Sequence, residues 1–439
     1  MDETKNRSLH LRLDARPPLL PVVTQFVETT ATVFGLGKEE SLKLVLATEE
    51  IFISLCNAVC PGNILEIDCQ DGLYYTRVIF RFTASDLNLR GLNIVSAVAY
   101  DRECDLEEMG LMIASRSVDR LHLTVEKGSR VSLAMTKEKA YPRMSEIIPP
   151  PEPPETVVLE TPDPEGVKRF ALLVGQAYAE KDRPAFFDYP GKVADMVAGG
   201  EFHCLAAMNP KREIVGGILF GDRSERIIHS FGPYLFHGGD GRRTGGALLE
   251  ACLGRIVRSK ALGLLSLSGL PPALEGQFEP LGSLSYRVPG SDPVARPFYF
   301  RHLHEDPGCE VWSRGELTAW LERQYDRLVL AREIRTVRAM GETRTGSSLL
   351  AAELSRERAE AVLRPLLPGA DLAATVERYI RFLTDDGFLN LFFELDLGVP
   401  WQGELIPILM GHGLKPEILL PFAGQADLVI FQRDDATES

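Results

Sequence analysis

The chain has 439 residues, too many for one ordinary domain, and its 45% hydrophobic and 25% charged residues are typical of soluble globular proteins. No apolar run reaches membrane-spanning length, the first residues lack a secretory signal, and the seven cysteines are scattered, so we expect a cytoplasmic protein with free thiols and no membrane partner. The net charge of −14 argues against nucleic acid as a partner, because phosphate binding needs clustered lysines and arginines.

Residues 1–140 have the pattern of an α+β domain. Alternating apolar residues predict a strand at 9–13, and apolar residues at helical spacing predict helices at 19–34 and 39–59. The dipeptide Asp71-Gly72 favours a hairpin turn. The strands on either side of this turn and the elements that follow are expected at 64–67, 74–82, 109–118 (a helix), 121–125 and 130–135.

The second of these helices and the late segment 109–113 resemble the GHKL ATPase superfamily, in its anti-sigma-factor, serine-kinase-like branch. That family has a glutamate followed one helical turn later by an asparagine that holds Mg²⁺. Glu50 matches the glutamate, but Ser54 stands in place of the asparagine, and residues 82–86 lack the family's Asp-x-Gly. The resemblance implies a GHKL-like α/β sandwich with a degenerate metal position, so we do not expect it to bind ATP and Mg²⁺.

A proline-rich stretch at 141–166 is the clearest domain boundary. Proline lacks an N–H donor and restricts the residue before it, so the run from Pro149 to Pro154 predicts an extended spacer. We therefore expect an N-terminal domain at 1–140, a linker at 141–166, and two further domains at 167–305 and 306–439.

Residues 167–305 predict a mixed α/β domain. A first strand is expected near 157–160, and a glycine-rich loop at 237–246 separates a long strand from a helix. The other expected elements are helices at 167–179, 189–197, 247–260 and 273–281, and strands at 203–208, 214–220, 227–236, 264–267, 283–286 and 297–300.

The loop Arg242-Arg243-Thr244-Gly245-Gly246-Ala247 resembles the acyl-CoA loop of the GNAT N-acetyltransferase superfamily, Arg/Gln-x-x-Gly-x-Gly/Ala, through Arg242, Gly245 and Ala247. Helix N-termini offer unused N–H groups, and glycines let the backbone approach a phosphate closely. The resemblance implies acetyl-CoA or another acyl-CoA as cofactor. Its pyrophosphate would lie on Arg242, Arg243, Thr244, Gly245, Gly246 and Ala247, and its pantetheine arm on the main chain of Tyr234 and Leu235. The alternative is a plain glycine-rich connection.

In the GNAT family an amine attacks the thioester, and a tyrosine often protonates the departing thiolate. Phe278 stands near the place of that tyrosine, which leaves the acid unassigned. Tyr286 is a candidate acid, and Glu225 and His229 are candidate bases. For each of the three, an ordinary packed or exposed strand residue is the alternative. No ligand cluster with zinc spacing is present, so no metal is expected.

Residues 306–439 have the pattern of a second copy of this unit. Residues 364–371 resemble 232–240, and residues 393–400 resemble 264–271, but the glycine-rich loop is missing. This implies a second GNAT-like domain without a CoA loop, which would wall the substrate cleft or form a homodimer; chance similarity is the alternative. The expected helices are 316–330, 371–383 and 403–411, and the expected strands 333–339, 348–354, 391–397, 417–421 and 427–431.

The sequence as a whole favours a regulatory multidomain acyltransferase. It would transfer an acyl group from acyl-CoA to an amine, with a degenerate anti-sigma-like domain at 1–140 that binds a regulatory protein partner. The rival is a non-catalytic interaction protein that binds CoA at most as a sensed ligand. A third reading is a working anti-sigma-type kinase, which needs Glu50 to act without an asparagine at position 54.

Overall fold

The computed structural model describes residues 7–58, 64–83, 93, 113–114, 116–126, 130–144, 146–237, 241–287, 290, 292–338, 344, 346–355 and 358–433. The chain divides into two compact units. Unit 1 comprises Met1–Ala140 and Arg338–Glu394, and unit 2 comprises Tyr141–Val337 and Leu395–Ser439. The boundaries expected from the sequence, at 140, 166 and 305, stay a prediction.

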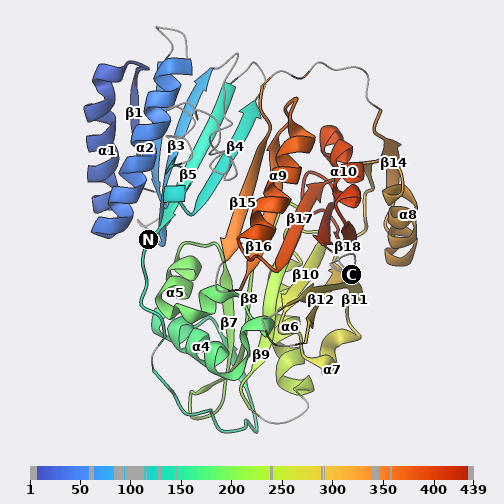
Figure 1. Ribbon diagram of the computed structural model, residues 1–439. Helices are drawn as coiled ribbons and strands as arrows, with labels where there is room; N and C mark the ends of the chain where they lie inside the picture. The colour runs from blue at the N-terminus through green and yellow to red at the C-terminus, as the bar shows by residue number, and fades with distance from the viewer. Residues whose placement is uncertain are drawn as a thin grey trace. The chain divides into compact units, whose positions relative to one another are not determined.

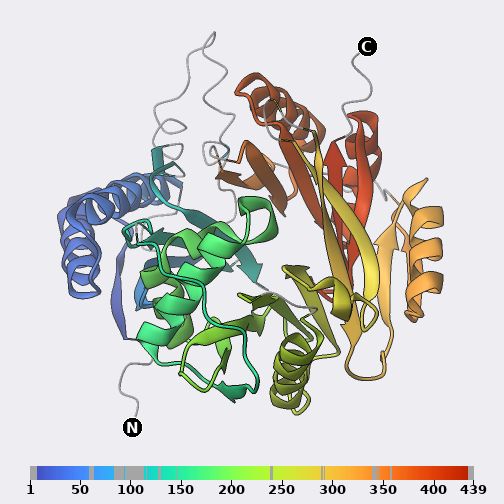
Figure 2. The same ribbon diagram turned by 90° about the horizontal axis from the view of Figure 1, so that it is seen from below.

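The first part of unit 1 is an antiparallel sheet with two helices packed on one face (Figures 1 and 2). Its strand order is β1-β2-β3-β5-β4. Alternate residues of β2, namely Leu65, Ile67 and Cys69, are buried against the helices, as expected for a strand with one covered face. The elements are β1 Ser8–Asp14, α1 Leu20–Val33, α2 Lys38–Ala58, β2 Ile64–Asp71, β3 Tyr75–Thr83, β4 Arg120–Glu126 and β5 Arg130–Glu138. The helix expected at 109–118 lies mostly outside the described residues.

The second part of unit 1 packs on the first through a shared hydrophobic core and through hydrogen bonds of the Asn93 side-chain amide. The strands β15 (Leu349–Ser355) and β16 (Glu360–Leu367) are antiparallel, and helix α9 (Leu372–Asp385) leads from β16 to the parallel strand β17 (Asn390–Asp396). Leu349 joins the core under α1 and α2. The Asn93 side chain donates to the Ser348 carbonyl at 2.7 Å and accepts from the Leu350 N–H at 3.0 Å, which satisfies main-chain groups at the start of β15.

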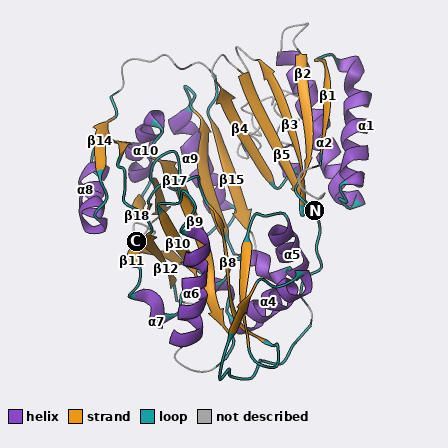
Figure 3. Cartoon of the chain, turned by 180° about the vertical axis from the view of Figure 1, so that it is seen from behind, coloured by secondary structure: helices purple, strands orange, loops and turns teal. Residues whose placement is uncertain are grey.

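Unit 2 is built on a seven-stranded sheet ordered β11-β12-β10-β9-β8-β7-β6. Strands β9 and β10 run parallel, and helix α6 connects them. Added Cβ atoms at the neighbouring Gly216 and Gly217 would lie 3.4 Å from Leu248 of α6 and 2.6 Å from the Phe170 ring of α4, so these helices cover opposite faces of β8. Figure 3 shows α4 and α5 together and away from α6. The elements are β6 Val158–Glu160, α4 Pro164–Ala177, α5 Pro190–Ala198, β7 His203–Met208, β8 Ile214–Asp222, β9 Ile227–Leu235, α6 Arg242–Ile256, β10 Gly263–Ser268, α7 Pro272–Glu275, β11 Glu279–Tyr286 and β12 Val294–His302.

The last five-stranded sheet has the order β15-β16-β17-β19-β18, which is the order of β8-β9-β10-β12-β11 in the larger sheet. Both contain a parallel pair joined by a helix, β9-α6-β10 and β16-α9-β17. In both, the parallel pairing stops early: at Phe231 although β9 continues along β8, and at Leu363 although β16 continues along β15. The remaining elements of unit 2 are β13 Cys309–Ser313, α8 Leu317–Leu328, β14 Arg332–Thr336, α10 Ile406–Gly411, β18 Leu414–Leu420 and β19 Leu428–Arg433.

Within unit 2 the edge strand β11 lies against β18 and β19. A Cβ at Gly282, whose φ is +128°, would lie 3.0 Å from the Glu417 carbonyl oxygen. The Ser285 N–H donates to Gln432 Oε1 at 2.9 Å. The edge of the larger sheet is therefore covered by the C-terminal hairpin.

Several element boundaries differ from those the sequence predicts. Helix α6 begins at Arg242 rather than near Ala247, because Gly241 takes a left-handed φ of 66° and the Gly245 N–H already donates to its carbonyl at 2.8 Å. The helix expected at 273–281 ends at Glu275, and β11 begins soon after it. Strand β13 was not expected; it pairs in parallel with β14.

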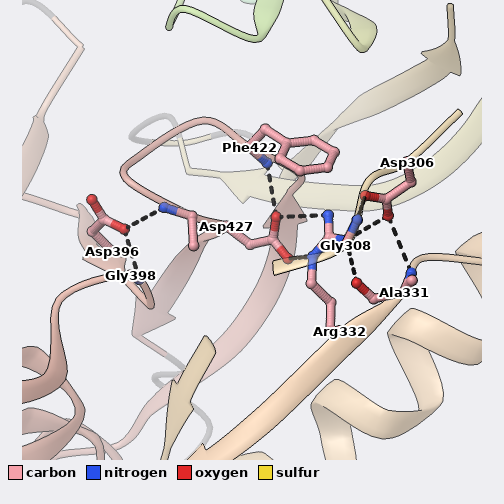
Figure 4. A network of polar contacts seen from close by, with 9 residues as sticks. Asp306, Gly308, Ala331, Arg332, Asp396, Gly398, Phe422 and Asp427 are labelled. Carbon is pink, nitrogen blue, oxygen red and sulfur yellow. Dashed lines mark hydrogen bonds and ion pairs between the residues drawn. The ribbon is translucent and has the colours of Figure 1, made fainter. Parts of the chain in front are cut away.

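A buried ionic network fastens β14 to the C-terminal hairpin (Figure 4). The Arg332 guanidinium donates to Asp427 at 2.6 and 3.1 Å and to Asp306 at 2.5 Å, and the Arg332 and Asp427 side chains are fully buried. Asp427 also accepts the Phe422 N–H at 2.8 Å. Burial alone would lower the pKa of Arg332, but the hydrogen bond and charge of Asp427 raise it above its ordinary value, so the arginine stays charged.

Replacing this arginine should destabilise unit 2 strongly. In Arg332→Ala, two carboxylates lose their cation, and breaking a buried pair in this way costs about 3–5 kcal/mol. Arg335→Ala is the matched control, because Arg335 lies on the same strand and makes exposed ion pairs with Glu310 and Glu333; it should cost less than about 1 kcal/mol. Urea unfolding of both variants measures the difference, and equal losses would contradict the network's role.

Candidate functional site

The candidate site of unit 2 begins where β9 and β10 separate. β9 pairs with β10 only as far as Phe231, while its remaining residues pair with β8 as far as Leu235. The Phe236 N–H donates to Val215 of β8 at 3.0 Å. Since alternate residues of a strand direct their main-chain groups to opposite sides, Leu235 presents its N–H and C=O to the gap.

Tyr178, which follows helix α4, occupies this gap. Its hydroxyl accepts the Leu235 N–H at 2.8 Å and donates to the Leu235 carbonyl at 3.2 Å. Burial raises the pKa of Tyr178, so the hydroxyl stays protonated and serves as donor and acceptor at once. Nothing in the sequence around Tyr178 marks it, because its partner is 57 residues away.

Tyr234 closes the inner part of the same gap with its side chain. Its hydroxyl bonds Ser268 Oγ at 3.0 Å at the end of β10, and its ring lies over Gly269, where a Cβ would approach the ring to 2.3 Å. The φ of +73° at Gly269 also favours glycine. The Tyr234 carbonyl would lie 2.8 Å from a Cβ at Gly216 of β8, so its main chain faces β8 rather than the gap.

The N-terminus of α6 is the second part of the candidate site. Its helical hydrogen bonds begin with the Gly245 N–H, so the preceding N–H groups have no partner inside the helix, and the N-cap residue Gly241 has no side chain to cap them. Arg242 and Arg243 are exposed there, and Arg243 Nη1 donates to the Glu155 carbonyl at 3.1 Å. Positive side chains and a helix N-terminus together favour an anion.

The small residues of the predicted loop have different surroundings in this first turn. Thr244 and Gly245 are buried, and a Cβ at Gly245 would lie 3.2 Å from Leu274 of α7, so Gly245 permits close packing. A Cβ at Gly246 would meet no atom within 4 Å. Gly246 and Ala247 are half-buried on the next part of the turn.

His229, a candidate base, lies on β9 among aromatic rings. Its ring makes edge-to-face contacts with Phe202 and Phe231 at centroid distances of 5.4 and 5.3 Å, and its buried Nδ1 has no hydrogen-bond partner among the residues that the structure describes. Burial lowers the pKa of His229 to about 4, with a smaller contribution from the charge of Arg223. The imidazole is therefore neutral near pH 7 but a weak base.

The other catalytic candidates do not gather around His229. Tyr286 ends β11, where the Arg296 guanidinium lies 4.3 Å from its ring centroid. Glu225 is exposed in the turn that precedes β9, at the opposite end of that strand from Leu235. Phe278 is buried in the core beneath α6 and carries no hydroxyl. The structure thus brings Tyr178, Tyr234, Leu235 and the α6 N-terminus to one end of β9, and Tyr178 is the member that the sequence did not reveal.

In unit 1, Glu50 and Ser54 lie on α2, both half-buried. Burial, followed by the charge of Glu49, raises the pKa of Glu50. The lid segment of the GHKL resemblance lies outside the described residues. Among the residues that the structure describes, no group of three or more His, Cys, Asp or Glu could hold a metal ion, and no helix is long and apolar enough to cross a membrane.

Comparison with known proteins gives partial structural likenesses. No protein-family model matches the chain, and no curated protein matches it. The RsbU and RsbW domains of a Mycobacterium tuberculosis protein are 13% identical with a TM-score of 0.23, and the match covers 31% of this chain and 33% of that one. The matched part of this chain therefore spans only about a third of that structure's length.

Acetyltransferase structures also match the chain. A GNAT family N-acetyltransferase of Escherichia coli, in complex with CoA, is 14% identical with a TM-score of 0.26, and the match covers 43% of this chain and 93% of that one. The aminoglycoside 6′-N-acetyltransferase of Enterococcus faecium is 11% identical with a TM-score of 0.27, covering 34% and 99%. These low TM-scores assign no function to this chain, whose fold is mixed α/β with several sheets.

The buried neutral imidazole predicts a pH dependence of stability. An unfolded histidine takes up its proton near pH 6.5, whereas folded His229 stays neutral down to about pH 4. The neutral form therefore stabilises the fold fully above pH 6.5, and this contribution is lost as the pH falls to about 4. The loss should reach roughly 3 kcal/mol.

Wild type and His229→Phe, unfolded by urea at pH 7 and pH 4.5, isolate this effect, because other groups titrate equally in both. The difference in unfolding free energy between the two proteins should shift in favour of the variant at the lower pH. A difference that does not change with pH would contradict a buried neutral His229.

Proposed function

We propose that unit 2 is an acyl-CoA-dependent N-acyltransferase of GNAT type, with its cofactor site at the open edge of β9 and the N-terminus of α6. The observation that carries the proposal is the separation of the parallel strands β9 and β10 directly before the loop that leads into α6. A gap between strands accepts an extended amide-containing chain, and the following helix N-terminus accepts phosphate.

The residues present fit the two ends of an acyl-CoA. The pyrophosphate would lie on the first turn of α6, with Arg242 and Arg243 exposed beside it and open space above Gly246. The pantetheine arm would lie along the edge at Leu235, whose N–H and C=O face the gap. When bound, acyl-CoA would supply the activated acyl thioester.

The chain's own groups would bind and orient the reactants. Main-chain N–H groups of β9 would polarise the acyl carbonyl. Tyr286, at the end of β11, would be the acid that protonates the departing thiolate. The neutral imidazole of His229 would be the base, although its lowered pKa makes it a weak acceptor of the amine's proton. The acceptor would be an amine that enters with its proton removed by solvent or by such a base.

A second candidate function is a non-catalytic CoA-binding regulatory protein. It is favoured by the buried Phe278 in place of an acid and by the distance of Glu225, at the other end of β9, from the gap. In both candidates unit 1 would bind a regulatory protein rather than ATP and Mg²⁺, since Ser54 stands on α2 where the resemblance calls for a metal-binding asparagine. An ATP-dependent kinase remains the third candidate and requires ATP binding at Glu50.

The second sheet would be an internal repeat of the GNAT-like core without a cofactor site. The matching strand order and the early end of the β16–β17 pairing support the repeat. At the N-terminus of its helix α9, the Asp371 carboxylate accepts bonds from the Ser348 N–H and hydroxyl at 2.6 and 2.9 Å. A carboxylate already lies where the first copy would take a phosphate.

Calorimetric titration with acetyl-CoA tests the cofactor site. Gly246→Glu adds a carboxylate beside the proposed pyrophosphate without a clash and should weaken binding at least tenfold, and Arg242→Ala should weaken it several-fold, by loss of charge attraction. The matched control is Gly254→Glu, which adds the same charge to the same helix at another open position and should bind as wild type does.

Release of free CoA in the presence of a panel of small amines then separates the two candidates. Turnover supports the transferase, whereas binding without turnover of any amine supports the regulatory protein. If acetyl-CoA does not bind, or if both glutamate variants bind as wild type does, the proposed site is wrong. Heat from ATP and Mg²⁺ alone would favour the kinase reading.

A further inference from the structure

The hydroxyl of Tyr178 occupies the hydrogen-bonding position that an amide would take on the open edge of β9. It bonds both the N–H and the C=O of Leu235, at 2.8 and 3.2 Å. A neighbouring strand or an amide ligand would bond the same two groups, because main-chain donors and acceptors that are buried require partners. Tyr178 thus substitutes for the missing strand.

Leu235 is the residue of this edge that an amide can use fully. Pro233, two residues before Leu235, has no N–H to donate. The main chain of Tyr234 faces β8. For a ligand amide on this part of β9, Leu235 offers a donor and an acceptor together, and these are the two groups that Tyr178 holds.

Tyr178 is held in this position from several sides. Its N–H donates to the Val174 carbonyl at 3.0 Å, and its carbonyl accepts Arg183 Nε at 3.1 Å. Arg183 in turn pairs at 2.5 Å with Asp188, and both side chains are buried. The Tyr178 ring lies edge-on to Tyr234 at 4.7 Å. The hydroxyl is therefore placed by the fold rather than by chance rotation of an exposed side chain.

We infer that Tyr178 is a gate residue: its hydroxyl competes for Leu235 with the secondary amide of an entering ligand, such as the pantetheine arm of an acyl-CoA, and so lowers the affinity for such ligands. The inference rests on the proposed function and deepens it. A nucleotide without the arm, such as 3′-phospho-ADP, uses the α6 N-terminus alone and leaves Tyr178 in place. An acyl-CoA must displace the hydroxyl, and its affinity is lower because the two hydrogen bonds between Tyr178 and Leu235 have to break.

The test compares two probes, acetyl-CoA and 3′-phospho-ADP, on wild type, Tyr178→Phe and Tyr178→Ala. Removing the hydroxyl leaves the Leu235 N–H and C=O without Tyr178, so the ligand amide bonds them without competition. Acetyl-CoA should therefore bind on the order of tenfold more tightly. Binding of 3′-phospho-ADP should change less than twofold. Tyr189→Phe, which removes a hydroxyl at the start of α5, is the control and should match wild type for both probes.

Amide hydrogen exchange at Leu235 gives a readout that does not depend on affinity. The Leu235 amide should exchange faster in Tyr178→Phe than in wild type, and acetyl-CoA, but not 3′-phospho-ADP, should restore its protection. Far-ultraviolet circular dichroism confirms that each variant is folded.

The outcomes separate the gate from the proposed function. If both probes bind and acetyl-CoA affinity is unchanged or lower in both Tyr178 variants, the gate is wrong and the cofactor site stands. If neither probe binds wild type or any variant, the cofactor site is wrong and the gate fails with it. Tighter acetyl-CoA binding with protection restored at Leu235 supports the gate.

Discussion

Parallel strands β9 and β10 separate after Phe231, and beyond that point β9 pairs with β8 on one side while the main-chain groups of Leu235 on the other side bond a side chain instead of β10. This separation determines the surroundings of the candidate site. Tyr178 satisfies Leu235, Tyr234 reaches Ser268 across the gap, and Gly269 makes room for the Tyr234 ring. The loop that follows turns into α6 through Gly241, so the gap and the helix N-terminus lie in sequence along one stretch of chain.

The parallel pairing of β16 with β17 also ends early, and different side chains form bonds near the two separations. Arg364 of β16 pairs with Glu394 of β17 at 2.5 Å, and Asp371 accepts hydrogen bonds at the start of α9. Near the end of the β9–β10 pairing, the bonds come from the neutral hydroxyls of Tyr178 and Tyr234. Breaking an ion pair that is partly buried costs more than breaking the hydrogen bonds of a hydroxyl.

The sequence predicted most helices and strands because periodicity and turn residues are local signals, but it missed β13 and β16. It misplaced the start of α6, because the pattern does not show which loop residue precedes the helix; Gly241 does so, with a φ of 66° and with Leu235 2.5 Å from where a Cβ would lie. The cofactor role of residues 242–247 was predicted from their pattern and stays a prediction. Tyr178 and Arg332 were not predicted, because their partners Leu235 and Asp427 lie 57 and 95 residues away.

The covered edge of β11 has a consequence for how the chain can be divided. A fragment that ended near residue 305 would keep all seven strands of the larger sheet but lose the Ile418 and Gln432 contacts on Gly282 and Ser285. Strand β11 would then offer unpaired main-chain groups to solvent along the sheet's edge. Such an edge recruits other strands, so the isolated fragment should self-associate even where each copy folds correctly.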